Sequence, residues 1–365
     1  MNSSLLRLKE VALYFLHLGC TGFGGPLALV SMMQQDLAEK RKWITTEEFV
    51  TAISLIKVLP GAFAFQTAVF MGHRRAGIPG GLLAGACLIF PAFLMMCGLA
   101  AIYDEWGGNT YFKTLTIGFG IGALALIIYS LVQISKPYQK QSLFYFCAAI
   151  SFLGMFFQIA PEPVLILALG FLTWVWNFKS RKLSLEAGSI LLLCWIAFKS
   201  GAFVFGSGLA IAPLLENDFV REQQWVDLAT FMTALAFGQM TPGPVLVTIT
   251  FLAFRLGGFP AAFAATFFVF LPGYIHMLTW FPIFFKKVSA SRGFRDFAIG
   301  AIGGVIGAIT VFVVRAFLPA NGETNFVSAG PLILLSACLI LIAKWKIPSW
   351  LIILGSGLVY FCTQI

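Results

Sequence analysis

Long apolar stretches recur along the whole chain, with only short polar segments between them. Because a helix needs about 20 apolar residues to cross a bilayer, this pattern predicts an all-α integral membrane protein, a polytopic bundle of about 10 to 12 spans. Four short stretches, beginning at 142, 163, 329 and 348, are interpreted as tightly packed crossings or as half-spans. The apolar stretches lie at about 11–34, 48–72, 78–103, 114–134, 142–159, 163–178, 187–214, 228–253, 260–284, 296–317, 329–343 and 348–364.

Composition supports a membrane location. Of the 365 residues, 59% are hydrophobic and 11% are charged, whereas soluble domains carry about 25% charged residues. The apolar stretches leave no segment long enough for a soluble domain. The amphipathic first ten residues precede an apolar run without an Ala-x-Ala-like cleavage site, so we expect no removed signal peptide.

Composition also argues against several kinds of chemistry. The seven cysteines lie in apolar stretches without a Cys-x-x-Cys pair, and the three histidines are widely spaced. Neither a metal site nor a cofactor is therefore expected. The net charge of +9 is interpreted as basic cytoplasmic loops rather than as nucleic-acid binding. No combination of nucleophile, acid–base pair or metal cluster indicates an enzyme.

The two halves of the chain are copies of one unit. A shift of 182 positions, and after one deletion a shift of 181, brings identical residues into register. Register kept over about 75 residues indicates duplication, with repeats at 1–182 and 183–365. Thr45, with Glu48 behind it, and its counterpart Asp227 are preferred N-cap residues and predict a helix start in each repeat. The matched pairs include Gly19 with Gly201, Gly24 with Gly206, Asp36 with Asp218, Trp43 with Trp225, Pro60 with Pro242, Gly61 with Gly243, and Gly77 with Gly258.

Charge placement favours inverted repeats over parallel ones. In the first repeat, the basic residues at 40–42 and 74–75 mark cytoplasmic loops, and the acidic segment 103–106 is expected outside. In the second repeat, the loop at 221–224 has lost its positive excess, and the basic residues lie at 286–295 instead. The bias has thus changed sides, as in transporters built from inverted repeats.

The same rule predicts broken or re-entrant helices. With basic residues on both flanks, the stretch 48–72 cannot cross once, so we expect it to enter and leave on one side. The stretch 11–34, preceded by Arg7 and Lys9, is expected to do likewise.

Two glycine-rich and proline-rich motifs, each present in both repeats, supply the breaks. They are Gly22-Phe23-Gly24-Gly25-Pro26, matched by Phe205-Gly206-Ser207-Gly208, and Leu59-Pro60-Gly61-Ala62, matched by Thr241-Pro242-Gly243-Pro244. Broken helices expose backbone N–H groups whose positive dipole ends attract anions. The alternative is that these glycines only permit close helix packing.

Lys57 lies directly before one of the breaks. A lysine near mid-membrane costs about 2.5–3.5 kcal/mol, so it normally faces a cavity or a partner. The alternative is that Lys57 snorkels to an interface; its counterpart in the second repeat is Gln239. Further polar residues, Lys199, Arg255 and His276, line the path or have structural roles. No acidic residue lies at the centre of a span, which favours an anion as substrate.

These motifs, together with Glu39-Lys40-Arg41-Lys42-Trp43 and Gln239-Met240-Thr241-Pro242-Gly243-Pro244, resemble the chromate ion transporter family in its two-domain form. The resemblance covers essentially the whole chain. It implies a multi-pass protein of the bacterial inner membrane that expels chromate, confers chromate resistance and depends on the proton motive force. Sulfate, a tetrahedral oxyanion of the same charge, is the expected competitor.

Some positions depart from the family pattern. Lys57 stands where the family usually has Gln, Ala62 replaces a proline, and Ala64-Phe65 replace a polar pair. Leu209 stands where a histidine is frequent. These departures leave the choice of oxyanion open.

The sequence therefore predicts a secondary transporter for a tetrahedral dianion, bound between the repeats at the helix breaks, with one repeat moving against the other. Another anion, a non-transporting membrane protein, and a homodimer in place of a monomer are kept as alternatives. The expected ligands are backbone N–H groups at the glycines, hydrogen bonds from Gln66, Ser207, Gln239 and Thr241, and charge from Lys57. The candidate substrate-binding residues are Phe23, Gly24, Gly25, Pro26, Lys57, Pro60, Gly61, Gln66, Phe205, Gly206, Ser207, Gly208, Gln239, Thr241, Pro242, Gly243 and Pro244.

Overall fold

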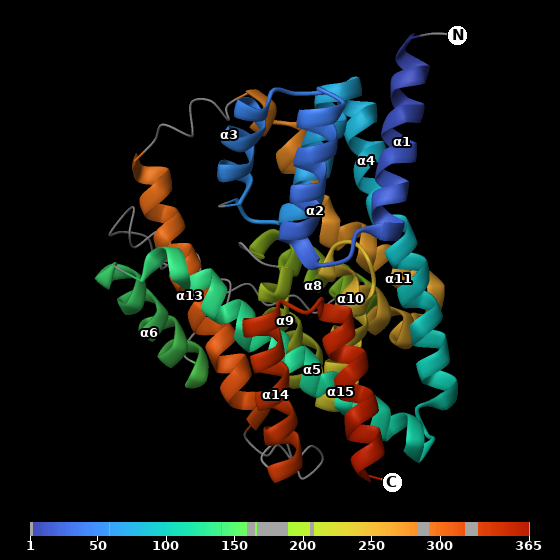
Figure 1. Ribbon diagram of the computed structural model, residues 1–365, viewed down its shortest axis with the longest axis vertical. Coiled ribbons are helices and arrows are strands. Elements are labelled where there is room, and N and C mark those ends of the chain that lie inside the picture. The colour runs from blue at the N-terminus through green and yellow to red at the C-terminus, as the bar shows by residue number, and fades with distance from the viewer. Residues whose placement is uncertain are drawn as a thin grey trace.

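A computed structural model describes residues 3–57, 59–139, 141–158, 165, 189–204, 208–283, 292–317 and 328–364. Every regular element in these ranges is a helix, which confirms the all-α prediction (Figure 1). Most of the stretch expected at 163–178 and the basic loop residues Lys286 and Lys287 lie outside the described residues.

The first repeat contains α1 (Ser3–Thr21), α2 (Gly25–Met33), the π-helix η1 (Gln34–Lys40), α3 (Thr46–Ile56), α4 (Phe63–Trp106), α5 (Thr110–Ser135), η2 (Lys136–Tyr138) and α6 (Ser142–Phe156). The second contains α8 (Ser189–Phe203), η3 (Gly208–Ala210), α9 (Ile211–Glu216), the π-helix η4 (Asn217–Glu222), α10 (Leu228–Met240), η5 (Val245–Val247), α11 (Thr248–Leu278), α13 (Arg292–Phe317), α14 (Ala329–Trp345) and α15 (Ser349–Gln364). Within the described residues, four helical stretches are long and apolar enough to cross a membrane: Phe63–Trp106, Thr110–Tyr138, Val245–Ile283 and Ile299–Phe317.

Both α4 and α11 are helical hairpins. The turns lie at Gly77 and Gly258, whose φ angles of 66° and 63° belong to the left-handed region that glycine tolerates. A Cβ on Gly85 would touch Phe65, so the two arms of α4 run back along each other. The 2.7 Å hydrogen bond between the hydroxyls of Thr250 and Thr266 joins the arms of α11 in the same way. Each hairpin has a short arm (63–75 or 248–256) and a long arm (78–106 or 259–278).

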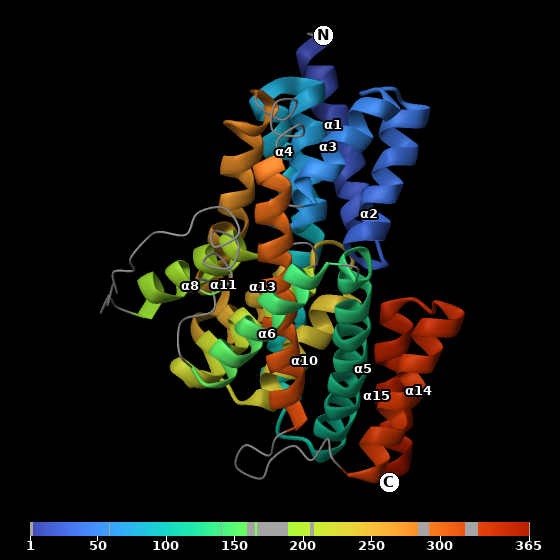
Figure 2. The same ribbon diagram turned by 90° about the vertical axis from the view of Figure 1, so that its left-hand side faces the viewer.

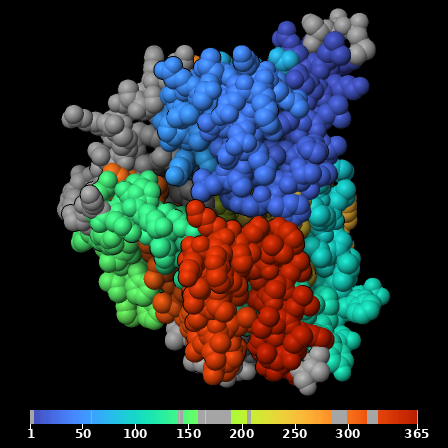
Figure 3. Space-filling model, viewed as in Figure 1, coloured from blue at the N-terminus to red at the C-terminus, as the bar shows by residue number. Residues whose placement is uncertain are grey.

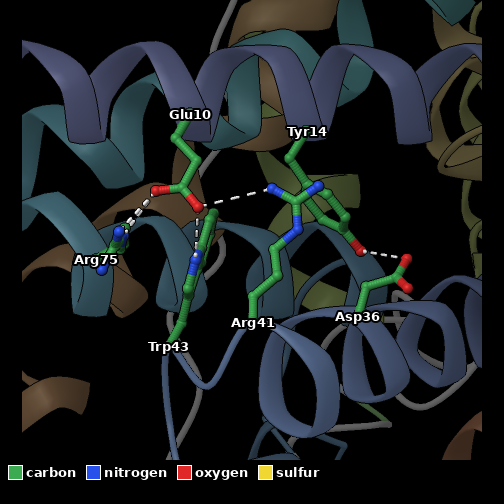
Figure 4. A network of polar contacts seen from close by, with 6 residues as sticks. All are labelled: Glu10, Tyr14, Asp36, Arg41, Trp43 and Arg75. Carbon is green, nitrogen blue, oxygen red and sulfur yellow. Dashed lines mark hydrogen bonds and ion pairs between the residues drawn. The ribbon is translucent and has the colours of Figure 1, made fainter.

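Ion pairs gather the start of α1, the start of α3 and the turn of α4 at one end of the molecule. The Arg74 guanidinium lies 2.7 Å from the Glu48 carboxylate, and Arg75 lies 2.7 Å from Glu10. Glu10 also accepts a hydrogen bond from Trp43 and lies 3.7 Å from Arg41 (Figure 4). The stretches 11–34 and 48–72 therefore enter and leave at one end, which confirms the re-entrant prediction.

The second repeat has the same arrangement at the opposite end. Arg255, near the turn of α11, lies 2.5 Å from Asp104 at the end of α4 and donates to Thr230 at the start of α10. Lys199 on α8 lies 2.5 Å from Asp218 in η4, because the chain has turned back after the break between α8 and α9.

Equivalent long arms run antiparallel across the molecule. The Tyr274 hydroxyl donates to the Leu82 carbonyl at 2.9 Å, and the rings of Phe93 and Phe259 lie 5.5 Å apart. Leu82 contacts Tyr274, whereas Phe93, later in the first repeat, contacts Phe259, which is earlier in the second. The two long arms therefore run in opposite directions. The predicted inverted arrangement is present.

Local details recur in both repeats. Thr45 caps α3 by accepting from the Glu48 N–H, and Asp227 caps α10 by accepting from the Thr230 N–H, as predicted. A Cβ on Gly19 would clash with the Leu88 carbonyl. A Cβ on its counterpart Gly201 would clash with the Val269 carbonyl. These glycines therefore allow α1 and α8 to lie close to the long arms.

We divide the helices into two groups that cut across the repeat boundary. We call α1–α4 with α8–α11 the core, and α5, α6, α13, α14 and α15 the frame. Within the frame, α5 of the first repeat packs on α14 and α15 of the second, and α13 of the second packs on α6 of the first (Figure 2). The repeats are thus interlocked on the outside as well as joined at the centre.

Candidate functional site

The helix breaks of the two repeats meet in pairs. The Gly61 N–H donates to the Val204 carbonyl at 2.6 Å, and the Gly243 N–H donates to the Gly22 carbonyl at 3.2 Å. Under the repeat shift Gly61 corresponds to Gly243 and Gly22 to Val204, so each repeat's second break binds the other repeat's first break. The sequence predicted that these two N–H groups face the anion. Each donates instead to a carbonyl, because a buried backbone donor takes the nearest acceptor.

A cavity of about 600 Å³ lies beside these breaks, between the core and the frame. The first repeat and the hairpin of α14 and α15 meet across the middle of the face shown in Figure 3. The core residues that line the cavity are Phe23, Gly24, Gly25, Pro26, Leu27, Lys57, Leu209, Gln239, Thr241, Gly243 and Val245. The frame residues that line it are Leu126, Tyr129, Ser130, Gln133, Ile134, Pro137, Tyr138, Ile302, Ile342, Lys346, Ile347, Pro348, Ser349 and Trp350.

The N-terminus of α2 faces this cavity. Gly24 and Gly25 have φ angles of 107° and 80°, a left-handed turn that glycine adopts without strain and that lets the nine-residue α2 begin abruptly. Among the described residues, no side chain caps this end. The first-turn N–H groups and the positive end of the helix dipole are therefore available to an anion.

Two side chains predicted from the sequence add to this end. Lys57 is the C-cap of α3, lines the cavity and is exposed, with no carboxylate in salt-bridge range among the described residues. Gln239, near the end of α10, is only 8% exposed, and its Nε2 has no hydrogen-bond partner within the described part of the chain. A buried, unpartnered amide donor is costly, so it indicates a ligand at this position.

The charge of the cavity has one sign. Among its described lining residues Lys57 and Lys346 are the charged side chains, and none is acidic. A second cavity, of about 270 Å³ near Arg255, is different because Asp104 and Asp227 balance Lys113 and Arg255 there. The larger cavity is therefore the one suited to an anion.

Other candidates lie away from the cavity. Gln66 is fully buried, and its Nε2 donates to the Pro60 carbonyl at 2.7 Å. This hydrogen bond satisfies a backbone carbonyl within the same helix break. His276 Nδ1 lies 3.2 Å from that same carbonyl. Pro60, Gly61, Gly208, Pro242 and Pro244 do not line the cavity. Phe205, Gly206 and Ser207 lie outside the described residues.

The basic residues Lys199 and Arg255 are held in the ion pairs described above, which gives them structural roles. The frame side of the cavity, Lys346 above all, was not predicted from the sequence. Lys346 stands in Lys344-Trp345-Lys346, between two short apolar stretches, and this pattern is typical of an ordinary loop. Within the described chain, no three His, Cys, Asp or Glu side chains gather as a metal site requires.

The family model described as Chromate transporter matches residues 9–174 and again 191–361. The chain belongs to this family. The two matches lie one in each half and so support the duplication, and the chromate transporter family and the apolar helices together make this a helical membrane protein. No solved structure matches the chain.

Named relatives cover most of the chain. A chromate transport protein of Cupriavidus metallidurans is 33% identical over 338 residues, covering 85% of this chain and 84% of its own. A probable chromate transport protein of Synechococcus elongatus is 32% identical over 336 residues, covering 83% and 84%. A chromate transport protein of Pseudomonas aeruginosa is 28% identical over 330 residues, covering 81% and 79%. Their names point to a transporter rather than an enzyme.

Proposed function

We propose that this protein is a secondary active transporter that exports chromate across the inner membrane of a bacterium and confers chromate resistance. The observation that carries the proposal is the cavity between core and frame. There the α2 N-terminus, the Lys57 ammonium and the unpartnered Gln239 amide converge without an acidic side chain among the described lining residues. The names of the relatives support chromate as the anion.

The lining suits a tetrahedral dianion. A unit charge pair 4 Å apart contributes about 4 kcal/mol at an effective dielectric of 20, before desolvation. Lys57 supplies such a charge, the helix end supplies N–H donors, and the unpartnered Nε2 of Gln239 supplies a side-chain donor, whereas the Thr241 hydroxyl donates to the Gly238 carbonyl at 3.2 Å. These donors come from separate segments of the chain. The four oxygens of a tetrahedral oxyanion can accept hydrogen bonds from several directions at once and so can use them together.

The basic end of the molecule defines the proposed orientation. Arg41, Arg74 and Arg75 lie at the end that holds the start of α1, and Asp104 lies at the opposite end. By the positive-inside rule the first end faces the cytoplasm. Chromate then enters from the basic side and leaves at the other.

The contacts favour a movement of the core against the frame, rather than of one repeat against the other. A rigid movement of the repeats would break both central hydrogen bonds, Gly61 to Val204 and Gly243 to Gly22. The cavity, in contrast, lies on the boundary between core and frame, and movement there changes its access.

Sulfate is the second candidate substrate, because it has the shape and charge of chromate, and the charge and hydrogen-bond donors of the cavity act on both anions alike. Accumulation of labelled chromate in cells with and without the protein tests the proposal, with Lys57→Ala as the variant. We expect lower accumulation with the unchanged protein and a much smaller difference with Lys57→Ala. Equal accumulation with and without the protein would contradict chromate export.

A further inference from the structure

The turn between α14 and α15 forms one wall of the proposed anion cavity. Lys346, Ile347, Pro348, Ser349 and Trp350 all line it. The Trp350 ring lies 6.3 Å from the ring of Phe23, the residue just before the Gly24-Gly25 turn that opens α2. The turn therefore stands opposite the α2 N-terminus, on the frame side of the cavity.

Lys346 is held at this wall in an unusual conformation. Its φ angle is 51°, a left-handed value that lysine rarely adopts, and its N–H donates to the Ile342 carbonyl at the end of α14. It is exposed and has no carboxylate in salt-bridge range among the described residues. Lys344, two residues earlier, lies over the Trp345 ring at 5.9 Å and does not line the cavity.

A second helix N-terminus accompanies Lys346. The 16-residue α15 begins at Ser349, so its first-turn N–H groups lie at the cavity wall. The independent sign of a ligand is Gln239, whose Nε2 is buried and unpartnered on the same cavity. The cavity thus has a lysine and a helix N-terminus on its core side, and a lysine and a helix N-terminus on its frame side.

We propose that Lys346 and the N-terminus of α15 form the frame half of the anion site, opposite Lys57 and the N-terminus of α2. The inference rests on the proposed function and adds a residue that determines charge selectivity. Two lysines on opposite walls neutralise a dianion, whereas a monoanion leaves one lysine uncompensated. A bound dianion also connects core to frame, the two bodies between which we propose movement.

The test is chromate uptake by the full-length protein in proteoliposomes, with sulfate and perchlorate as competitors. Both are tetrahedral, but perchlorate carries a single charge. We expect Lys346→Gln to raise the KM for chromate about tenfold, with a smaller change in kcat, and to weaken competition by sulfate but not by perchlorate. Lys346→Arg should retain the original KM for chromate and the original competition by sulfate. The matched variant Lys344→Gln should behave as the unchanged protein.

Lys346→Gly guards against a folding artefact. Glycine accepts a positive φ without strain, so this variant should be at least as thermally stable as the unchanged protein while losing affinity for chromate. If Lys346→Gln and Lys346→Gly keep the original KM and the original sulfate-to-perchlorate preference, the inference is wrong while the proposed function stands. If the unchanged protein takes up no chromate, both are wrong.

Discussion

The N–H of Gly61 donates to the carbonyl of Val204 at 2.6 Å, and this bond joins the second break of one repeat to the first break of the other. Its counterpart, from Gly243 to Gly22, measures 3.2 Å. Reciprocal contacts of this kind are what a two-fold relation between identical units produces. The centre of the protein is therefore a product of the duplication, and the substrate cavity lies to one side of it.

The first prediction concerns Gly61, whose φ angle of 127° is strained for any other residue and whose added Cβ would collide with Gln66 Nε2. Gly61→Ala should lower stability by about 1–3 kcal/mol, measured by thermal unfolding in detergent. Gly98→Ala is the control, because nothing lies within 4 Å of a Cβ there. Equal unfolding midpoints for the two variants would contradict the role given to the break.

The second prediction concerns Lys57. Because its ammonium supplies charge on the core wall, Lys57→Ala should raise the KM for chromate about tenfold, equivalent to about 1.4 kcal/mol of binding. Lys57→Arg should retain most of the affinity. Lys9→Ala removes the same charge near the start of α1 and should leave the KM unchanged. A KM unaffected by Lys57→Ala would exclude Lys57 from the site.

The third prediction separates binding from stability at Gln239. Gln239→Leu removes a buried, unpartnered donor, so the free energy of unfolding should stay the same or rise, while chromate uptake falls. Gln239→Glu should reduce uptake further, since a carboxylate repels the anion. Uptake and thermal unfolding of the same preparations check both effects. Normal uptake by Gln239→Leu would show that its amide does not bind substrate.

The fourth prediction is a pH dependence at the basic end (Figure 4). Burial raises the pKa of Glu10, but hydrogen bonds from Arg75 and Trp43 and the charges of Arg75 and Arg41 outweigh it and hold this pKa below its usual value. A depressed pKa adds stability above the unfolded value of about 4.3, and this stability is lost as the pH falls through the folded pKa.

The unfolding temperature of Glu10→Gln should therefore lie below that of the unchanged protein at pH 7, and the gap should narrow as the pH falls below about 4.3. Glu47→Gln is the control, because Glu47 is exposed and has no ion pair within the described chain. A gap that does not change with pH would contradict the network.

The fifth prediction concerns the moving bodies. In a background without the seven native cysteines, a cross-link between Phe93→Cys and Phe259→Cys joins the two repeats within the core, where the rings lie 5.5 Å apart. This cross-link should leave chromate uptake intact. A cross-link between Phe23→Cys and Trp350→Cys joins core to frame and should stop chromate uptake. The opposite result for the first pair would favour movement of repeat against repeat.

The sequence predicted the parts of this architecture that local chemistry determines. Proline and glycine mark the breaks, and basic residues on both flanks of 48–72 show that it turns back. Other features depend on contacts between distant segments. The partner of the Gly61 N–H lies in the other repeat, and Gln66 turns to its own break instead of to the cavity. Lys346 reaches the site only because α14 and α15 pack beside α5.

The most direct test of chromate transport at this cavity is the uptake of labelled chromate by inverted membrane vesicles that contain the protein. We expect uptake that requires an imposed proton gradient, falls with excess sulfate, and falls sharply in Lys57→Ala but not in Lys9→Ala. Uptake equal to that of vesicles without the protein, or equal in Lys57→Ala and the unchanged protein, would contradict chromate transport at this cavity.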